Sequence, residues 1–411
     1  MTVSTNPVAI EEALTRSIAE ILPSKEGLRK QLASGRRLSF YVGIDPTADY
    51  VHLGHSTNYL LLERLHVLGH KIIVLVGDFT AMIGDPSDKT SMRVQLTREE
   101  VLKNLQSFKA QIGKILNFED TVNPIEFKFN SEWLSKLTFA DTVELASNFT
   151  VQQMVERDAF KKRLAAEKPL FVHEFFYPLM QGYDSVALEV DVEIGGTDQT
   201  FNMLAGRTLL KRFKNKEKFV ITTTLLENPE TGEKLMSKSL GTGVGLDESA
   251  QSMFIKIMQL PDPGVIQCFI DCTRLSLEEI QGYRKQLKDG VNPRTVKLAL
   301  ATEVVCMYHG KNEAKRARDN WIAQVSNKEL PDDIASIRLP DESDNIIDII
   351  VSTGVVESKA QARRLVTQGA IRLNEKRIED INALVEIKEG DILRIGKKHT
   401  FRFRAALRND T

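Results

Sequence analysis

An alternation of strand and helix patterns between residues 39 and 129 restricts the fold of this 411-residue chain more than any other feature. Residues 72–76 form a continuous apolar run, which is typical of a strand buried on both faces of a parallel sheet. Strand patterns also cover 39–44 and 125–129, and helix patterns occupy 53–68 and 97–116. This β-α-β-α-β order predicts an α/β fold with a Rossmann-like, doubly wound parallel sheet.

The remaining patterns divide the chain into further parts. Residues 130–177 are mostly helical and predict an insertion, because strand patterns return only at 190–194 and 219–223. We therefore expect a Rossmann-like domain at 1–226, a mobile loop rich in Gly, Thr and Ser at 227–246 and an all-helical domain at 247–328. A polar stretch at 329–342 predicts a linker, and 343–411 predicts a small α+β module.

Composition agrees with a soluble protein of several domains. The net charge of −1 gives no overall attraction to nucleic acid, and no apolar run approaches the roughly 18 residues of a membrane span. Glu11, Arg16 and Glu20 among apolar residues predict an amphipathic N-terminal helix and not a signal peptide. Three cysteines, an odd number, favour a reducing cytoplasm over a disulfide scaffold.

Two pairs of potential metal ligands carry little weight. Cys268 and Cys272 are spaced to share a helix face, but no further ligands are suitably spaced, which favours two buried small hydrophobes. His66 and His70 have the same spacing, yet Gly69 lies between them and favours a helix C-terminus. No metal site is predicted.

The C-terminal module is basic in two places. Its helix at 358–367 carries Lys359, Arg363 and Arg364, and the last twenty residues carry six basic side chains against few acids. Such charge usually marks only a solvated face, but here it accompanies a helix-helix-strand unit. That combination resembles the RNA-binding module first seen in ribosomal protein S-four, which implies RNA binding.

His52-Leu53-Gly54-His55, the first signature, follows a strand and opens a helix. The free N–H groups of a helix N-terminus favour an anion, and the two imidazoles, three residues apart, face the same side. Gly54 leaves room for a nucleotide against the backbone. This pattern predicts a phosphate-binding position.

Met236-Ser237-Lys238-Ser239, the second signature, brings one cation and two hydroxyls in the glycine-rich loop. Such a loop can close over a triphosphate during reaction. A P-loop is excluded at 84–90, since Asp88 and not glycine precedes Lys89. Together, the two signatures resemble those of class I aminoacyl-tRNA synthetases.

Four further motifs make the resemblance specific. They are Tyr41-Val42-Gly43-Ile44-Asp45-Pro46-Thr47, Gly84-Asp85-Pro86-Ser87, Tyr177-Pro178-Leu179-Met180-Gln181-Gly182-Tyr183-Asp184 and Gly195-Gly196-Thr197-Asp198-Gln199. All four resemble motifs of the bacterial tyrosyl-tRNA synthetases, and the resemblance runs nearly end to end. It implies a tyrosine–tRNA ligase that forms tyrosyl-adenylate from tyrosine and ATP and then charges a tyrosine tRNA.

The resemblance also implies the roles of individual residues. Around tyrosine, Tyr41 and Asp184 would bind the phenol, while the ammonium would be held by Asp85, Tyr177 and Gln181. Asp45 and Gln199 would lie near the reacting carboxylate. In the ATP site, Gly196 and Asp198 would bind the ribose, and His55 would contact the nucleotide nearer its ribose. Thr47 and His52 would contact the outer phosphate. Lys238 would hold the pyrophosphate.

Physical chemistry agrees with a tyrosine slot. The polar end offered by Tyr41 and Asp184 would be left unpaired by phenylalanine, at about 1–3 kcal/mol per buried group. Tyrosyl-tRNA synthetase itself serves as the standard example of this discrimination.

The family further implies Mg²⁺ on the phosphates without a dedicated protein site. It implies that 247–328 lies on the anticodon side and that the insertion forms a homodimer interface. Phe149, Val151 and Met154 are apolar there, and core is their default assignment. Candidates for tRNA contact are Lys89, Arg93, Arg363 and Arg364.

Some positions depart from the family. Leu235 stands where the second signature usually begins with lysine, and Lys234 lies one position earlier. Val42, Asn58 and Glu193 replace side chains found in better-known relatives. Alternatives are a tryptophan-specific relative, a small-molecule nucleotidyltransferase and a non-catalytic RNA-binding protein on a synthetase scaffold.

Overall fold

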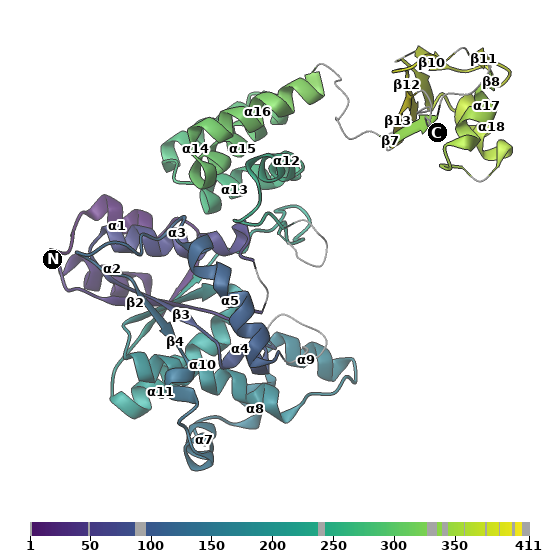
Figure 1. The fold of residues 1–411 in the computed structure, drawn as a ribbon. Helices are drawn as coiled ribbons and strands as arrows, with labels where there is room; N and C mark the ends of the chain where they lie inside the picture. The colour runs from purple at the N-terminus through teal and green to yellow at the C-terminus, as the bar shows by residue number, and fades with distance from the viewer. Residues whose placement is uncertain are drawn as a thin grey trace, which may run out of the picture. The chain divides into compact units, whose positions relative to one another are not determined.

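The computed structural model describes residues 2–47, 50–86, 96–236, 243–326, 335–338, 344–356, 358–374, 376–385, 387–396 and 399–404. The chain divides into two compact units, Met1–Trp321 and Ile322–Thr411. The first contains the predicted sheet, the insertion and nearly all of the helical domain (Figure 1).

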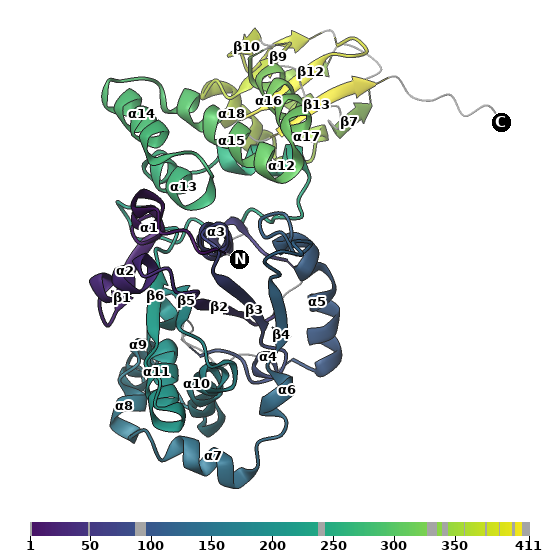
Figure 2. The ribbon, with the colours of Figure 1, turned by 90° about the vertical axis from the view of Figure 1, so that its left-hand side faces the viewer.

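The central sheet has the order β1-β6-β5-β2-β3-β4. Its five parallel strands are β2 (Ser39–Ile44), β3 (Lys71–Val76), β4 (Glu126–Phe129), β5 (Val192–Gly196) and β6 (Phe219–Thr223). The chain winds outward from β2 to β4, then returns to the other side of β2 with β5. This confirms the doubly wound fold and places the reversal of strand order between β2 and β5 (Figure 2).

Helices cover both faces of the sheet. The helix α3 (Leu53–Val67) lies on one face, and α10 (Phe176–Leu188) and α11 (Thr200–Lys214) lie on the other (Figures 1 and 2). The helix α5 (Arg98–Ile112) begins as predicted, because Thr97 and Glu100 form a reciprocal capping box. It ends before the predicted limit of 116, at Ile112, and Gly113 follows as its C-cap.

The N-terminal prediction was wrong in part. The helix α1 (Pro7–Ala13) is shorter than expected, and Glu20 lies in β1 (Ile18–Leu22), which pairs antiparallel with β6 at the sheet edge. A second helix, α2 (Lys25–Ala33), follows. The guanidinium of Arg16 is buried, and it donates to the carbonyl oxygens of Thr273 and Leu275, which follow the helix α13 (Val265–Cys272).

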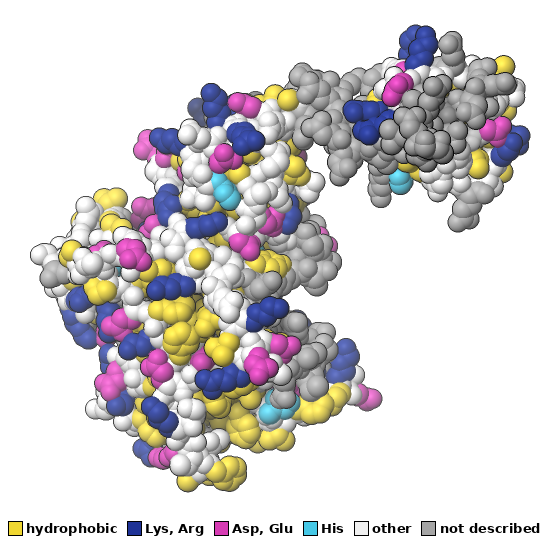
Figure 3. Space-filling view, viewed as in Figure 1, with side chains coloured by type: hydrophobic (Ala, Val, Ile, Leu, Met, Phe, Trp, Pro, Cys, Tyr) yellow, Lys and Arg dark blue, Asp and Glu magenta, His cyan; other side chains and the backbone are white. Residues whose placement is uncertain are grey.

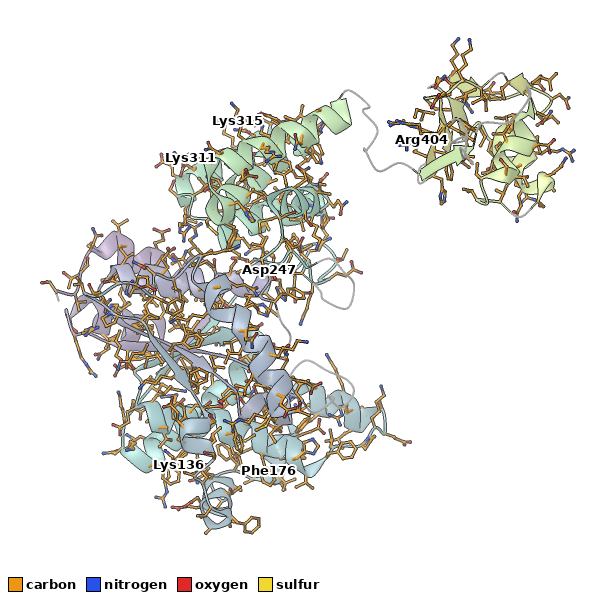
Figure 4. The ribbon with its side chains drawn as sticks, in the orientation of Figure 1. Lys136, Phe176, Asp247, Lys311, Lys315 and Arg404 are labelled. Atoms are coloured by element: carbon orange, nitrogen blue, oxygen red, sulfur yellow. The ribbon has the colours of Figure 1, made fainter. Side chains whose placement is uncertain are left out.

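The insertion is helical, as predicted. Its elements are α6 (Ser131–Leu134), α7 (Phe139–Ala146), α8 (Val151–Val155), α9 (Asp158–Ala165) and the 3₁₀ turn η1 (Val172–Phe175). Figure 4 labels Lys136 near its start and Phe176, where α10 begins. Met154 is buried and Phe149 half-buried, whereas Val151 is exposed.

The helical domain follows the second signature. Its helices are α12 (Ala250–Met258), α13 (Val265–Cys272), α14 (Leu277–Lys288), α15 (Pro293–His309) and α16 (Lys311–Ser326), the last carrying Lys311 and Lys315 (Figure 4). Cys268 and Cys272 are both buried on α13. In the described residues, no helix is long and apolar enough to cross a membrane.

The C-terminal unit contains the predicted helices and strands. The helices α17 (Ile346–Ser352) and α18 (Lys359–Thr367) accompany a sheet ordered β10-β9-β12-β13-β7. Its strands are β9 (Ile371–Leu373), β10 (Lys376–Ile378), β12 (Ile392–Ile395), β13 (His399–Arg404) and β7 (Ala335–Arg338), while β8 (Asp344–Asn345) pairs with β11 (Leu384–Val385).

The predicted linker at 329–342 needs correction. Strand β7 lies inside it and pairs in parallel with β13, so the sheet of the C-terminal unit begins before residue 343. The polar residues on both sides of β7 led to the prediction of a linker. The strand forms because β13, which is distant in sequence, supplies its hydrogen bonds.

Candidate active site

A cavity of about 770 Å³ opens where the parallel strands end. Asp45 and Thr47 follow β2, Thr80 follows β3, and Asp198 follows β5; all four line the cavity. Ligands bind in doubly wound folds beyond the carboxyl ends of the strands, at the point where strand order reverses. The topology therefore puts this cavity where such a fold binds its ligand.

The first signature forms one wall of the cavity. His52 is the N-cap of α3, and the rings of His52 and His55 stack with centroids 3.8 Å apart. The backbone N–H of His52 donates to Nδ1 of His55 over 3.3 Å. A Cβ on Gly54 would lie 3.0 Å from Cε1 of His52, so any larger residue here would press on the His52 ring.

Residues that follow the second signature lie against the first. The N–H of Leu53 donates to the carbonyl oxygen of Val244 over 2.9 Å, and the N–H of Leu246 donates to that of Val51 over 2.8 Å. Met236 lines the cavity beside Gly54. Ser237, Lys238 and Ser239 lie outside the described residues, and Asp247 follows this segment near α3 (Figure 4).

The carboxylate of Asp45 is held from two sides. It accepts from the hydroxyl of Tyr177 at one oxygen and from that of Thr80 at the other, both over 2.8 Å. A Cβ on Gly77 would lie only 1.9 Å from Oδ1 of Asp45, so Gly77 provides the space for this arrangement. The side chain of Asp45 is thereby fixed at the carboxyl end of β2.

Asp184 forms a buried polar end of the cavity. Its carboxylate accepts from Nε1 of Trp133 over 2.7 Å and from Nδ2 of Asn130 over 3.3 Å. Burial raises the pKa of Asp184 well above its ordinary value, and the two donors oppose this rise.

Tyr41 was predicted beside Asp184, but its side chain is not part of the cavity lining. It is fully buried on β2, and its hydroxyl lies 3.1 Å from Oγ of Ser185. Burial, followed by the charges of Glu193 and Asp184, raises the pKa of Tyr41 well above its ordinary value, so the hydroxyl keeps its proton at neutral pH.

A second cluster of polar side chains surrounds Asp85. Its Oδ2 accepts from Nε2 of Gln199 over 2.7 Å, while Oε1 of Gln199 accepts from Asn202 over 3.1 Å. The guanidinium of Arg157 lies 3.8 Å from Oδ1 of Asp85 and is nearly buried. These contacts fix the orientation of both cavity-lining side chains.

The cavity thus joins most of the predicted residues. The predicted residues that line it are Asp45, Thr47, His52, Gly54, His55, Asp85, Tyr177, Gln181, Asp184, Gly196, Asp198 and Gln199. Lys234 also lines it, whereas Leu235 is buried against Gly264. Arg363 and Arg364 are exposed on α18, and Lys89 and Arg93 lie outside the described residues.

Several residues of the site were not predicted. Thr80 and Asn130 follow the ends of β3 and β4, so the rule on strand ends could have found them. Trp133 and Arg157 lie in the insertion, and no local pattern marks them. Within the described residues, no group of three or more His, Cys, Asp or Glu side chains is arranged to hold a metal ion.

Comparison with known proteins agrees with this geometry. Residues 33–326 match the model of the tRNA synthetases class I (W and Y). This chain belongs to that family. Residues 326–402 match the tyrosine–tRNA ligase SYY-like C-terminal domain, which extends the match over the second unit.

Relatives cover almost the whole chain. Tyrosine–tRNA ligase 2 of Clostridium acetobutylicum is 44% identical over 375 residues, which are 91% of this chain and 92% of the relative. The tyrosine–tRNA ligase of Carboxydothermus hydrogenoformans is 43% identical over 400 residues, which are 94% and 95% of the two chains. The predicted resemblance to bacterial tyrosyl-tRNA synthetases is confirmed.

The fold prediction is confirmed as well. A C-terminally truncated mitochondrial tyrosyl-tRNA synthetase of Aspergillus nidulans superposes with a TM-score of 0.65 at 23% identity. The alignment covers 77% of this chain and 92% of the fungal one.

Proposed function

We propose that this protein is a tyrosine–tRNA ligase, which activates tyrosine with ATP and transfers it to the 3′ end of a tyrosine tRNA. The observation that carries the proposal is that His52 and His55 of the first signature and Met236 of the second line one cavity. The hydrogen bond between Leu53 and Val244 joins the two segments of the chain. The buried carboxylate of Asp184 lies at another part of that cavity. One pocket thus offers positions for a nucleotide and for an aromatic amino acid with a polar tip.

In the first step, the tyrosine carboxylate attacks the α-phosphate of ATP, and pyrophosphate leaves. Both reactants are anions, so the protein must position them and offset the charge that develops. We assign the outer phosphate to Thr47 and His52, and the part nearer the ribose to His55. Gly196 and Asp198 are assigned to the ribose, and Lys238 to the departing pyrophosphate.

We assign one end of the cavity to the amino acid because hydrogen-bond acceptors line it. The carboxylate of Asp184 can accept a hydrogen bond from the phenol hydroxyl, and phenylalanine would leave that buried group without this partner. Asp85, Tyr177 and Gln181 are assigned to the ammonium, and Asp45 with Gln199 to the surroundings of the carboxylate. Tyr41 touches Ser185 instead of the cavity, so its contact with the phenol stays a prediction.

In the second step, a terminal ribose hydroxyl of the tRNA attacks the activated carbonyl. We assign tRNA binding partly to the C-terminal unit, where Arg363 and Arg364 are exposed on α18 and Arg404 ends β13 (Figure 4). Mg²⁺ carried on the ATP phosphates would neutralise part of their charge. A cytoplasmic location stays a prediction from the cysteine content.

We also infer that the protein forms a homodimer through the insertion. Apolar side chains are exposed on its helices: Phe139 is 83% and Val151 71% exposed. Figure 3 shows hydrophobic side chains gathered over α7 and α8. A second copy would cover them, since large exposed apolar patches mark interaction sites. In sedimentation, Phe139→Glu should shift the protein toward monomer, whereas Val8→Glu on α1 should not; a wild-type monomer would refute the dimer.

Exchange of labelled pyrophosphate into ATP tests the proposed activity directly. The purified protein is assayed with tyrosine, with tryptophan, with phenylalanine and without amino acid. We expect exchange with tyrosine and only background levels otherwise. Exchange with tryptophan alone would support the tryptophan-specific alternative, and exchange without amino acid would rule out amino-acid activation.

A further inference from the structure

A fully buried ion pair lies behind the amino-acid end of the cavity. Lys218, which precedes β6, contacts the carboxylate of Glu193 on β5, and their side chains are 0% and 2% exposed. The ammonium also donates to Oγ of Ser185 on α10 over 2.7 Å. Burying two charges is costly unless their remaining hydrogen bonds are made. The hydrogen-bond partners of this pair therefore indicate which groups it holds in place.

The oxygens of Glu193 have specific partners. Oε1 accepts from the side-chain amide of Gln181 over 3.0 Å, and Oε2 accepts from Ser185 over 3.2 Å and from Lys218. An ionised carboxylate can only accept, so the nitrogen of the Gln181 amide must face Glu193. The amide oxygen, on the other branch of the planar group, is then directed away from Glu193. Gln181 itself lines the cavity.

A glycine on the adjacent helix α11 leaves space for the cluster of Lys218, Ser185 and Glu193. A Cβ on Gly206 of α11 would lie 2.6 Å from Nζ of Lys218 and 2.6 Å from Oγ of Ser185. Contacts below 3.0 Å force a shift, so any other residue at 206 would displace the cluster. Burial lowers the pKa of Lys218, and the charge of Glu193 opposes this shift.

We propose that Glu193, with its charge balanced by Lys218, is a positioning residue that turns the amide oxygen of Gln181 toward the ammonium of the bound amino acid. The inference rests on the proposed function, because it names how that site recognises the amino group. Glutamine at position 193 could either donate or accept, and it would leave the Gln181 amide free to take both orientations.

The double substitution Lys218→Met and Glu193→Gln tests this role. It removes both charges together, so neither is left buried and unpaired, and it changes side-chain volume little. Binding of L-tyrosine and of 3-(4-hydroxyphenyl)propionate, which lacks the amino group, is measured by calorimetry on the full chain. We expect tyrosine to bind about tenfold more weakly and the amine-free analogue to keep its affinity within about twofold.

A matched control uses the same substitutions at another ion pair. Lys214 and Glu189 form an exposed pair, and Lys214→Met with Glu189→Gln should leave both affinities unchanged. If the buried double variant does not fold, Gly206→Ala disturbs the cluster without deleting any group, and the same selective loss is expected. Equal weakening of both ligands, or no weakening of tyrosine, would overturn the positioning role. Failure of the wild-type protein to bind tyrosine would instead overturn the proposed function.

Discussion

The backbone N–H of Leu53 donates a hydrogen bond to the carbonyl oxygen of Val244, 2.9 Å away, although 190 residues separate them along the chain. Leu53 begins α3 within the first signature, and Val244 follows the second. Because the bond joins backbone atoms, it does not depend on which side chains stand there. Backbone hydrogen bonds therefore hold the first signature against the residues that follow the second.

Gly54→Ala should impair use of ATP more than use of tyrosine. The added methyl group would press on the His52 ring and approach Met236, the first residue of the second signature. A displacement of this kind can reduce turnover about 10- to 100-fold. Pyrophosphate exchange at varied ATP and varied tyrosine measures the two effects separately.

Gly282 provides the control for this substitution. It lies within α14, and a Cβ there would meet nothing within 4 Å. Gly282→Ala should leave exchange unchanged and slightly stabilise the helix, by about 0.5–1 kcal/mol. If Gly54→Ala exchanges pyrophosphate as fast as the wild type, the close packing around His52 has no part in ATP use.

Lys238→Ala should lower turnover much more than it weakens tyrosine binding. The lysine is assigned to charge that develops as pyrophosphate leaves, so its loss should cost about 10²–10³-fold in kcat. The dissociation constant of tyrosine, measured in the absence of ATP, should stay unchanged. Unchanged turnover would remove Lys238 from the mechanism, and Lys234→Ala would then show whether the cavity-lining lysine acts instead.

Much of the fold could be predicted because strands buried on both faces leave a continuous apolar run. The strand predicted at 219–223 agrees with β6, and the one at 72–76 lacks only the first residue of β3. Strands β1 and β7 could not be predicted in the same way. Each is an edge strand whose hydrogen bonds come from a distant partner, β6 or β13. Strand β1 lacks an alternation of apolar and polar residues, and the alternation in β7 covers only Ala335–Arg338.

The candidate site was predictable where its residues lie within motifs. Asp45, Asp184 and Gln199 were found in this way, and all line the cavity. The residues that hold these side chains in place were not predicted, because their contacts join segments that are distant in sequence. Lys218 is adjacent to no motif and gains a role only when β6 lies beside β5 and its ammonium meets Glu193.

Removal of the C-terminal unit should separate the two steps of the reaction. The cut belongs after Ser326, because β7 is part of the second unit and a cut at residue 340 would leave it behind. The fragment 1–326 should retain pyrophosphate exchange and lose most tRNA charging, since the exposed arginines of α18 are gone. Aminoacylation with a tyrosine tRNA measures the second step. Charging at the full rate would show that the unit is not needed to hold the tRNA.

His70 should make the folded protein less stable as the pH falls below neutrality. Its imidazole is buried, Nδ1 accepts from the N–H of Leu38 over 3.3 Å, and burial, with the charge of Arg37, lowers its pKa to about 4. In the unfolded chain the pKa is about 6.5, so between these values the unfolded state binds more protons. Stability from this group is therefore complete above about pH 6.5 and is lost as the pH falls toward 4. Denaturant unfolding at pH 7.5, 6 and 5 should show a smaller decline for His70→Gln than for the wild type, and equal declines would contradict the assignment.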